Sequence, residues 1–211
     1  MNFPRWYPIL DTAFLSARGL DTEIAARGLL SGGARILQYR HKAQWTRQTL
    51  EQAEAVGALC REYGAMFVIN DRADMAALAG ADLHLGQTDL PPAEARKVVG
   101  DAAKVGFSTH NESQLRAAGS LPVDYVALGP IFGTTSKANP DPVVGLNELR
   151  RLRPLTTRPL IAIGGIRRGA AQEVLAAGAD SVAIISDICP DVNSETAWRH
   201  VAYQWITATN G

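Results

Sequence analysis

The chain has 211 residues, and its 21 Lys and Arg balance its 21 Asp and Glu, so no overall field attracts nucleic acid or an acidic membrane surface. This length is enough for one sizeable core and lies near the lower limit for an α/β barrel. Cys60 and Cys189 are too few and too widely spaced for a disulfide framework or a zinc site, so we expect reduced, mostly buried thiols. Residues 1–8 lack an apolar signal core and no stretch approaches roughly 18 apolar residues, so we expect a cytoplasmic protein without a membrane partner.

Short apolar segments alternate along the chain with segments of helical periodicity. The predicted strands are residues 7–10, 35–39, 66–69, 83–85, 104–107, 125–128, 160–163 and 181–185. The predicted helices are residues 22–30, 46–63, 72–79, 92–99, 112–118, 147–152, 170–177 and 195–207. Glycine often follows a helix, as a left-handed C-terminal cap favours, at Gly32, Gly64, Gly80, Gly119 and Gly178.

Strands that are separated by helices indicate parallel βαβ crossovers. Eight such units predict a single-domain (β/α)8 TIM barrel over residues 1–211, and a six-stranded doubly wound sheet is the alternative. No linker, low-complexity stretch or charge block marks a second domain. In a barrel, chemistry gathers at the C-terminal ends of the strands, so the polar residues there are the candidates for a site.

Polar residues end the second predicted strand at a spacing of two. Gln38, Arg40 and Lys42 therefore share one face of an extended strand, while Tyr39 and His41 point away. If the first face points into the barrel mouth, it offers two cations to an anionic ligand. The alternative is an exposed polar strand end without a ligand.

Carboxylates follow the third and fourth predicted strands. Asn70 and Asp71 end the third, and Asp89 comes shortly after the fourth. Magnesium takes one or two carboxylates and completes its shell with water and substrate phosphate, so two aspartates beside cations predict a site for a magnesium-bound diphosphate. The alternative is that Asp71, Asp89 and Ser108, which ends the fifth strand, each cap a following helix.

The longest irregular stretch, residues 129–142, follows the sixth strand. Long loops in compact domains are usually binding segments, and otherwise connectors. This one carries three hydroxyls and a lysine that suit phosphate, at Thr134, Thr135, Ser136 and Lys137. A double glycine at 164–165 and the pair Ile185-Ser186 end the last two strands, where barrels often bind phosphate through backbone amides; a tight turn is the alternative.

Together these segments resemble the thiamine-phosphate synthase family. The matching segments are 38–42, 69–72, 84–89, 108–110, 129–132, 134–137, 163–166 and 185–186. They stand in the family's order and cover nearly the whole predicted barrel. The chain departs from the family in two places. The segment before His84 is one residue shorter than in the family, which bears on the position of Asp89. Gly133 stands where the family often has proline.

The resemblance implies two substrates and a metal. Hydroxymethylpyrimidine diphosphate would be bound by Gln38, Tyr39, Arg40, His41, Lys42, Asn70, Ser108 and Lys137. Thiazole phosphate would be bound by Thr134, Thr135, Ser136, Gly165, Ile185 and Ser186. Mg2+ would be held by Asp71 and Asp89. The residues expected to act in catalysis are Arg40, Lys42, Lys137 and Ser108.

The expected reaction is dissociative. The pyrimidine's amino group stabilises a cation at the exocyclic methylene, diphosphate leaves, and the thiazole nitrogen captures the cation. One alternative is the related thiazole tautomerase, in which His110 would serve as an acid–base residue. Another is a non-catalytic binding protein for thiazole phosphate or thiamine phosphate. We expect His84 to be packed and hydrogen-bonded rather than catalytic. The sequence leaves the oligomeric state open, a homo-oligomer included.

Overall fold

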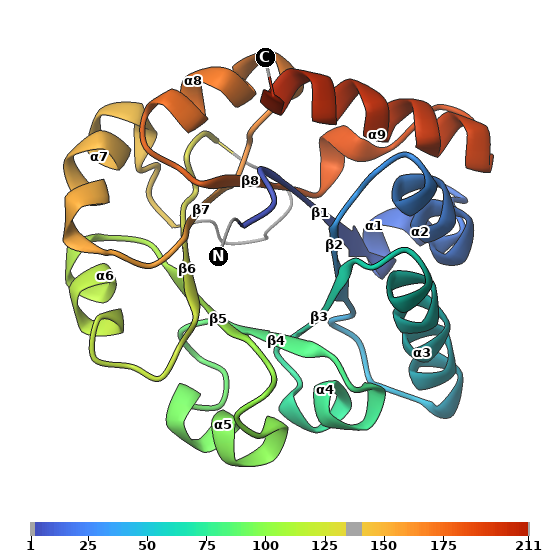
Figure 1. The fold of residues 1–211 in the computed structure, drawn as a ribbon, viewed down its shortest axis with the longest axis horizontal. Coiled ribbons are helices and arrows are strands. Elements are labelled where there is room, and N and C mark those ends of the chain that lie inside the picture. The colour runs from blue at the N-terminus through green and yellow to red at the C-terminus, as the bar shows by residue number, and fades with distance from the viewer. Residues whose placement is uncertain (1–2, 134–140, 211) are drawn as a thin grey trace.

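The computed structural model of the chain describes residues 3–133 and 141–210. In these residues eight parallel strands pair in chain order and close into a barrel (Figure 1). The strands are β1 Trp6–Asp11, β2 Ile36–Arg40, β3 Met66–Asn70, β4 Asp82–Leu85, β5 Val105–Thr109, β6 Tyr125–Leu128, β7 Leu160–Ile163 and β8 Ser181–Ile184. The ring closes where Trp6 of β1 pairs with Val182 of β8. The predicted (β/α)8 barrel is therefore confirmed, and the open doubly wound sheet is wrong.

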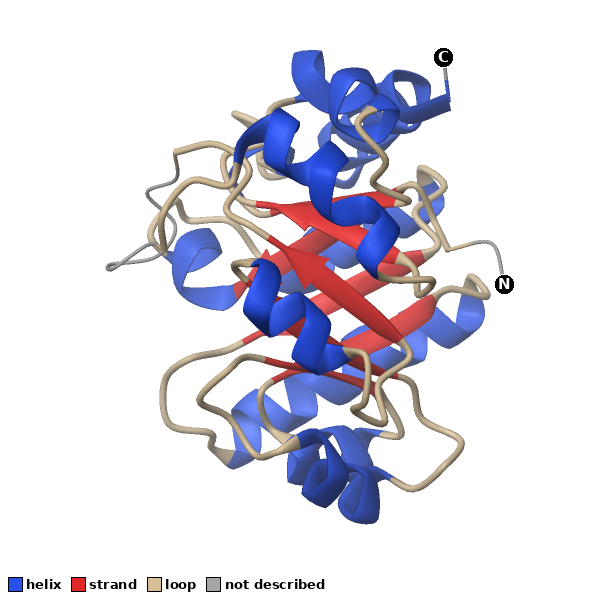
Figure 2. Cartoon of the chain, turned by 90° about the vertical axis from the view of Figure 1, so that its left-hand side faces the viewer, coloured by secondary structure: helices blue, strands red, loops and turns tan. Residues whose placement is uncertain are grey.

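Helices wrap the outside of the barrel, as the side view shows (Figure 2). Those in the described residues are α1 Thr12–Ser16, α2 Thr22–Ser31, α3 Arg47–Glu62, α4 Ala73–Ala79, α5 Pro92–Val99, α6 Glu112–Ala118, α7 Gly145–Leu152, α8 Ala171–Ala176 and α9 Glu195–Asn210. Short 3-10 turns lie at η1 Arg153–Leu155, η2 Arg168–Ala170 and η3 Ser186–Ile188. No helix in the described part of the chain is long and apolar enough to cross a membrane.

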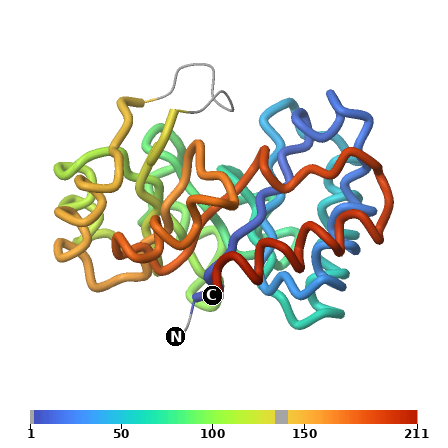
Figure 3. Tube along the Cα trace, turned by 90° about the horizontal axis from the view of Figure 1, so that it is seen from above, coloured from blue at the N-terminus to red at the C-terminus, as the bar shows by residue number. Residues whose placement is uncertain are grey.

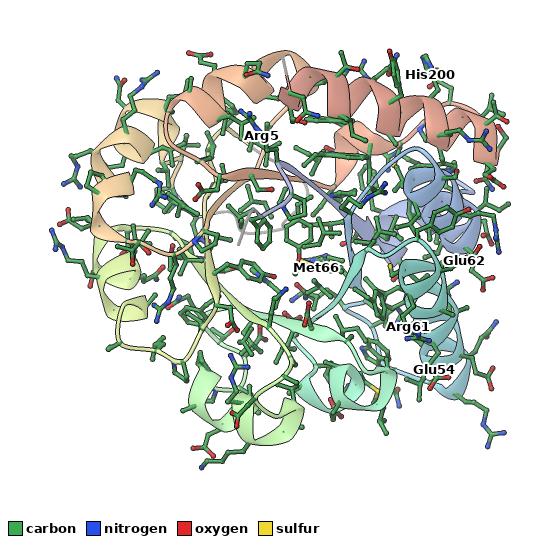
Figure 4. The ribbon with its side chains drawn as sticks, viewed as in Figure 1. Arg5, Glu54, Arg61, Glu62, Met66 and His200 are labelled. Atoms are coloured by element: carbon green, nitrogen blue, oxygen red, sulfur yellow. The ribbon has the colours of Figure 1, made fainter. Side chains whose placement is uncertain are left out.

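Each helix buries one face and exposes the other. On α3 the side chains of Glu54, Arg61 and Glu62 lie on the outer surface (Figure 4), whereas Val56 and Cys60 are fully buried. Cys60 and the half-buried Cys189 form no disulfide with each other, and the burial that we predicted for the cysteines holds for Cys60 and only in part for Cys189. Burial raises the pKa of the Cys60 thiol to about 12, so this cysteine stays protonated and unreactive at neutral pH.

The core has two parts because strand residues alternate between the two faces of the barrel wall. Ile36, Val68 and Ile161 belong to a cluster with Tyr7 and Tyr125 that fills the barrel interior. A larger cluster of buried apolar residues lies between the strands and the helices. Buried polar residues such as Gln38 and His84 lie among the apolar side chains of the barrel interior, so the interior does more than provide a packed core.

The C-terminal helix α9 packs directly on α2, so the two ends of the chain lie side by side (Figure 3). A Cβ atom on Gly32 would lie 2.5 Å from the Cβ atom of Ala202, so this glycine permits close helix contact. Gly32 and Gly119 have φ angles of −80° and −57°, which contradicts the left-handed caps that we predicted there. The prediction is confirmed where φ is positive, at Gly64, Gly80 and Gly178.

Candidate active site

A cavity of about 380 Å³ opens at the C-terminal ends of the strands, and all eight strands or the loops that follow them contribute to it. Of the predicted site residues, those that line it are Gln38, Arg40, Lys42, Asn70, Asp71, Asp89, Ser108 and Ile185. His84, His110, Gly164 and Asp141 also line it. The structure therefore brings together most of the predicted residues that lie in its described part.

The alternation that we predicted along β2 is confirmed. Gln38, Arg40 and Lys42 face the cavity, and the side chains of Tyr39 and His41 do not line it. The buried Tyr39 hydroxyl donates to Gln52 Oε1 of α3 at 2.8 Å, and the His41 ring bonds the hydroxyl of a threonine in α1 at 2.8 Å. These two side chains thus stabilise the wall behind the cavity.

Arg40 is held from the end of the neighbouring strand. Asp11 pairs with Arg40 across β1 and β2, and its carboxylate forms an ion pair with the guanidinium. The other carboxylate oxygen of Asp11 accepts the Phe14 N–H at 2.9 Å and so caps α1. Asp11 is 7% exposed. Sequence reasoning missed this residue because it ends an otherwise apolar strand without any flanking motif.

Asp71 does not cap the helix that follows it. Its φ angle is 66°, and it is the only non-glycine residue with positive φ in the part of the chain that the structure describes. The N-cap position of α4 is Arg72, which makes no side-chain capping bond. The Asp71 carboxylate instead forms an ion pair with Lys42 at the cavity. Left-handed backbone is unfavourable for residues with a Cβ and is less so for Asp. An unfavourable backbone conformation that serves no helix cap indicates a functional role for this carboxylate.

Asp89 lies near Asp71 despite the shorter segment before His84. Its Oδ2 accepts the Gly86 N–H at 2.6 Å, and α5 begins after Pro91 without a side-chain cap, so helix capping is wrong here too. Burial and the neighbouring Asp71 carboxyl group raise the pKa of Asp89. Two mutually repelling carboxylates at one rim are an arrangement that a cation stabilises.

The donor set fits magnesium rather than a closed transition-metal site. No cluster of three or more His, Cys, Asp or Glu side chains that could hold a metal occurs within residues 3–133 and 141–210. Magnesium is commonly bound by only one or two carboxylates, with water and phosphate completing the shell. Asp71 and Asp89 supply that number.

Asn70 and Ser108 face the cavity as polar groups at buried strand ends. Asn70 is 6% exposed, and its Nδ2 has no hydrogen-bond partner among the described residues. A buried amide donor without a partner is rare in folded proteins. Ser108 does not cap α6, because Asn111 does so by accepting the Gln114 N–H at 3.0 Å. Both side chains are thus available to a ligand.

His84 lies beside Ser108 in the barrel interior. It is 7% exposed, its Nε2 lies 2.9 Å from Ser108 Oγ, and its Nδ1 lies 3.2 Å from the Tyr125 hydroxyl. Burial lowers the pKa of His84 to about 4, so the ring is neutral at pH 7. The structure matches the expectation of a packed, hydrogen-bonded histidine.

The ends of β7 and β8 give a mixed result for the predicted phosphate clamp. Gly164 and Ile185 line the cavity. Gly165 has a φ angle of 65°, and a Cβ on it would lie 2.4 Å from the Gly133 carbonyl oxygen, so close packing alone requires glycine there. Ser186 begins η3 and is exposed. Thr134, Thr135, Ser136 and Lys137 lie outside the described residues.

The closed barrel, with a charged cavity at its C-terminal mouth, defines the class of the protein as an α/β-barrel enzyme that acts on small molecules. The family profile described as thiamine monophosphate synthase matches residues 6–188. The chain belongs to the thiamine monophosphate synthase family, and it is a transferase.

Individual relatives agree with this assignment. The chain is 48% identical over 198 residues to the thiamine-phosphate synthase of Koribacter versatilis, covering 90% of this chain and 92% of that one. It is 42% identical over 197 residues to that of Laribacter hongkongensis, covering 92% of each. The solved thiamine phosphate pyrophosphorylase of Pyrococcus furiosus superposes with a TM-score of 0.82 at 28% identity, covering 98% and 97% of the two chains.

Proposed function

We propose that this protein is a magnesium-dependent thiamine-phosphate synthase. It would transfer the hydroxymethylpyrimidine group from its diphosphate to the ring nitrogen of the thiazole phosphate, releasing diphosphate and thiamine phosphate. The observation that carries the proposal is one cavity that the cations Arg40 and Lys42 line together with the carboxylates Asp71 and Asp89, with Lys42 paired to Asp71. That combination suits a leaving group that carries several negative charges and a divalent cation.

The pyrimidine would lie against the uncharged polar residues deeper in the cavity. Gln38, Asn70 and Ser108 offer an amide, a second amide and a hydroxyl. The free Nδ2 of Asn70 supports this role, because a ligand acceptor would satisfy a donor that the described residues leave unpaired. The side chains of Tyr39 and His41 lie outside the cavity, so we propose for them support of the β2 wall rather than side-chain contact with substrate.

Mg2+ would be held by Asp71 and Asp89 and would neutralise charge on the diphosphate oxygens. Asp71 is already paired with Lys42, so magnesium and substrate would release this lysine to contact the diphosphate. The two carboxylates would then each have a cationic neighbour, which offsets their mutual repulsion.

The protein's cations would act most strongly as the carbon–oxygen bond breaks. Negative charge then builds on the departing diphosphate, and Arg40, Lys42 and Lys137 would stabilise it more in the transition state than in the ground state. Asp11 fixes Arg40 from behind, which keeps the guanidinium in place before the substrate arrives. No covalent enzyme nucleophile is needed, because the pyrimidine's amino group stabilises the cation itself.

The thiazole phosphate would be bound by Gly165, Ile185 and Ser186 together with the sequence 134–136. Its phosphate is remote from the reacting nitrogen, so binding it would orient the nitrogen toward the cation. For Thr134, Thr135, Ser136 and Lys137 the proposal depends on the family resemblance alone.

The test is a reaction with both substrates, with and without magnesium, after the protein has been treated with a chelator. We expect thiamine phosphate and diphosphate in equal amounts, only when magnesium is present. A rearranged thiazole phosphate without diphosphate release would instead identify a tautomerase, whose acid–base group would be His110, the cavity residue beside Asp141 at 3.6 Å. Binding of the substrates without either product would contradict an enzymatic role.

A further inference from the structure

Five side chains from five strands form one hydrogen-bonded series across the barrel interior. Gln38 Nε2 donates to the Tyr7 hydroxyl at 2.9 Å. The hydroxyls of Tyr7 and Tyr125 lie 3.2 Å apart, and His84 then connects Tyr125 to Ser108 through its two ring nitrogens, at 3.2 Å and 2.9 Å. The two ends of the series, Gln38 on β2 and Ser108 on β5, line the cavity, as do Tyr7 and His84.

The barrel is built to accommodate this series. A Cβ on Gly106 would lie 2.1 Å from Tyr125 Cζ, so only glycine at this position of β5 leaves room for the ring. The rings of Tyr7 and Tyr125 meet edge to face with centroids 6.4 Å apart, and both side chains are about 1% exposed. Two hydroxyls at this depth cannot be hydrated as they would be at the surface, so each must place its single proton on a neighbour.

The direction of the protons follows from the first bond. Because Gln38 gives an N–H to Tyr7, the Tyr7 hydroxyl accepts there, and the remaining partner for its own proton among the described side chains is the Tyr125 oxygen. Tyr125 must then donate to Nδ1 of His84. A neutral imidazole has one donor and one acceptor, so Nε2 carries the hydrogen and donates to Ser108.

We propose that Tyr7, Tyr125 and His84 are positioning residues that preset Gln38 as a hydrogen-bond acceptor and Ser108 as a donor toward the pyrimidine. The Gln38 amide nitrogen gives one N–H to Tyr7, which fixes the amide plane and leaves the carbonyl oxygen as the acceptor that Gln38 can offer the ligand. The Ser108 oxygen is occupied by His84, so its hydroxyl proton is free for the ligand. The two ends cannot change roles independently, because turning one reverses every bond between them.

This polarity matches an aminopyrimidine and rests on the proposed function. The amino group of such a ring donates and its ring nitrogens accept, which are complementary to an acceptor at Gln38 and a donor at Ser108. Reversal of the series would present the opposite pair. Tyr125, which does not line the cavity, therefore contributes to recognition of the substrate through its neighbours in the series.

The first experiment measures the His84 tautomer in the free protein, so it is independent of substrate. Nitrogen NMR on protein labelled with 15N-histidine distinguishes a protonated ring nitrogen from an unprotonated one. The His84→Gln variant identifies the signals by their loss. We expect a hydrogen on Nε2 and none on Nδ1 at neutral pH; a hydrogen on Nδ1, or equal populations of the two tautomers, would overturn the proposal.

The second experiment is a double-mutant cycle on the affinity for hydroxymethylpyrimidine diphosphate, measured by calorimetry. Tyr125→Phe keeps the ring and removes the hydroxyl, and we expect it to weaken binding roughly tenfold, as loss of a satisfied buried hydrogen bond does. In a Ser108→Ala background the same change should cost clearly less than in the wild type, because the part of the effect that passes through Ser108 is already lost. Equal factors in the two backgrounds would mean that Tyr125 is only structural.

Thr109→Val is the matched control for this cycle. Thr109 is a buried β5 residue whose hydroxyl donates to the Ala127 carbonyl at 2.8 Å, outside the series. Its substitution should alter affinity by the same small factor in both backgrounds. If wild-type protein binds no pyrimidine diphosphate, the proposed function fails, while the tautomer measurement still decides whether the series is directional.

Discussion

Replacing Asp71 with asparagine removes one of the two carboxylates that we assign to magnesium and leaves the shape of the side chain unchanged. Asparagine also tolerates the left-handed backbone that the φ angle of 66° requires. Only the charge changes, so the variant separates metal binding from backbone strain. Loss of outer-shell partners alone commonly costs 10–100-fold in metal affinity. We therefore expect a direct ligand to cost at least about 100-fold in the magnesium concentration that gives half-maximal rate.

The effect of this change on stability should be small. The ion pair that is lost joins Asp71 to Lys42, whose side chain is 50% exposed, so it contributes about 1 kcal/mol or less. Removing the charge also relieves repulsion on Asp89. Asp71→Ala should lose more, because alanine in left-handed backbone costs about 1–2 kcal/mol. For a chain of this length that is roughly 2–8 °C in melting temperature.

The assay is initial rate against magnesium concentration, together with thermal unfolding of the metal-free proteins. Asp74→Asn is the control, since Asp74 is an exposed α4 carboxylate that pairs with Arg72 and does not line the cavity. Asp71→Asn and Asp71→Ala should share one magnesium defect and differ in melting temperature. A folded Asp71→Asn protein with the wild-type rate and magnesium dependence would refute the metal assignment.

Three further predictions concern other parts of the structure. Burial gives the His84 ring a pKa of about 4 in the folded state, against about 6.5 in the unfolded state. Its contribution to the free energy of unfolding is therefore complete above pH 6.5, and about 3 kcal/mol of it is lost as pH falls to 4. Denaturant titrations at several pH values should show this loss of stability in the wild type and not in His84→Gln. Gly28→Ala places a Cβ atom 2.3 Å from the Cβ atom of Trp198 in α9 and should destabilise the fold by about 1–3 kcal/mol. Gly169→Ala, where no atom lies within 4 Å, should change the stability measured by thermal unfolding by no more than about 0.5 kcal/mol. Asp11→Asn leaves Arg40 without its counter-charge and should lower the free energy of unfolding by about 1.5–3 kcal/mol. Pyrimidine diphosphate should then raise the melting temperature of the variant more than that of the wild type. An equal rise in both proteins would contradict the pairing of Asp11 with Arg40.

The barrel was predictable from sequence because buried parallel strands are short apolar segments and the helices between them are periodic. Residues 66–69 and 160–163 illustrate this, and both lie within observed strands. Helix α1 was missed because its five residues are too few to show a period. The need for glycine at position 32 could not be predicted from sequence either, because it arises from contact with α9, which is distant in the chain and adjacent in space.

The cavity was predictable where local spacing determines which way a side chain points. The alternation at Gln38, Arg40 and Lys42 follows from strand geometry alone, and the structure agrees. Tyr7 and Tyr125 gave no such signal, because a tyrosine in a buried strand is an ordinary core residue. Their part in the site comes from facing each other across the barrel, between strands β1 and β6 that are not neighbours in the sheet.

The packing of α9 on α2 has a consequence for synthesis on the ribosome. Trp205 of α9 stacks on Trp6 of β1 with centroids 6.2 Å apart, and β1 also requires β8 as its partner. Both partners are translated long after the first strand and helix. At the usual elongation rates of roughly 5–20 residues per second, that delay is on the order of 10–30 s. The nascent chain therefore carries an unpaired sheet edge and an uncovered α2 face for most of its translation, and this is the interval in which it is most prone to associate wrongly.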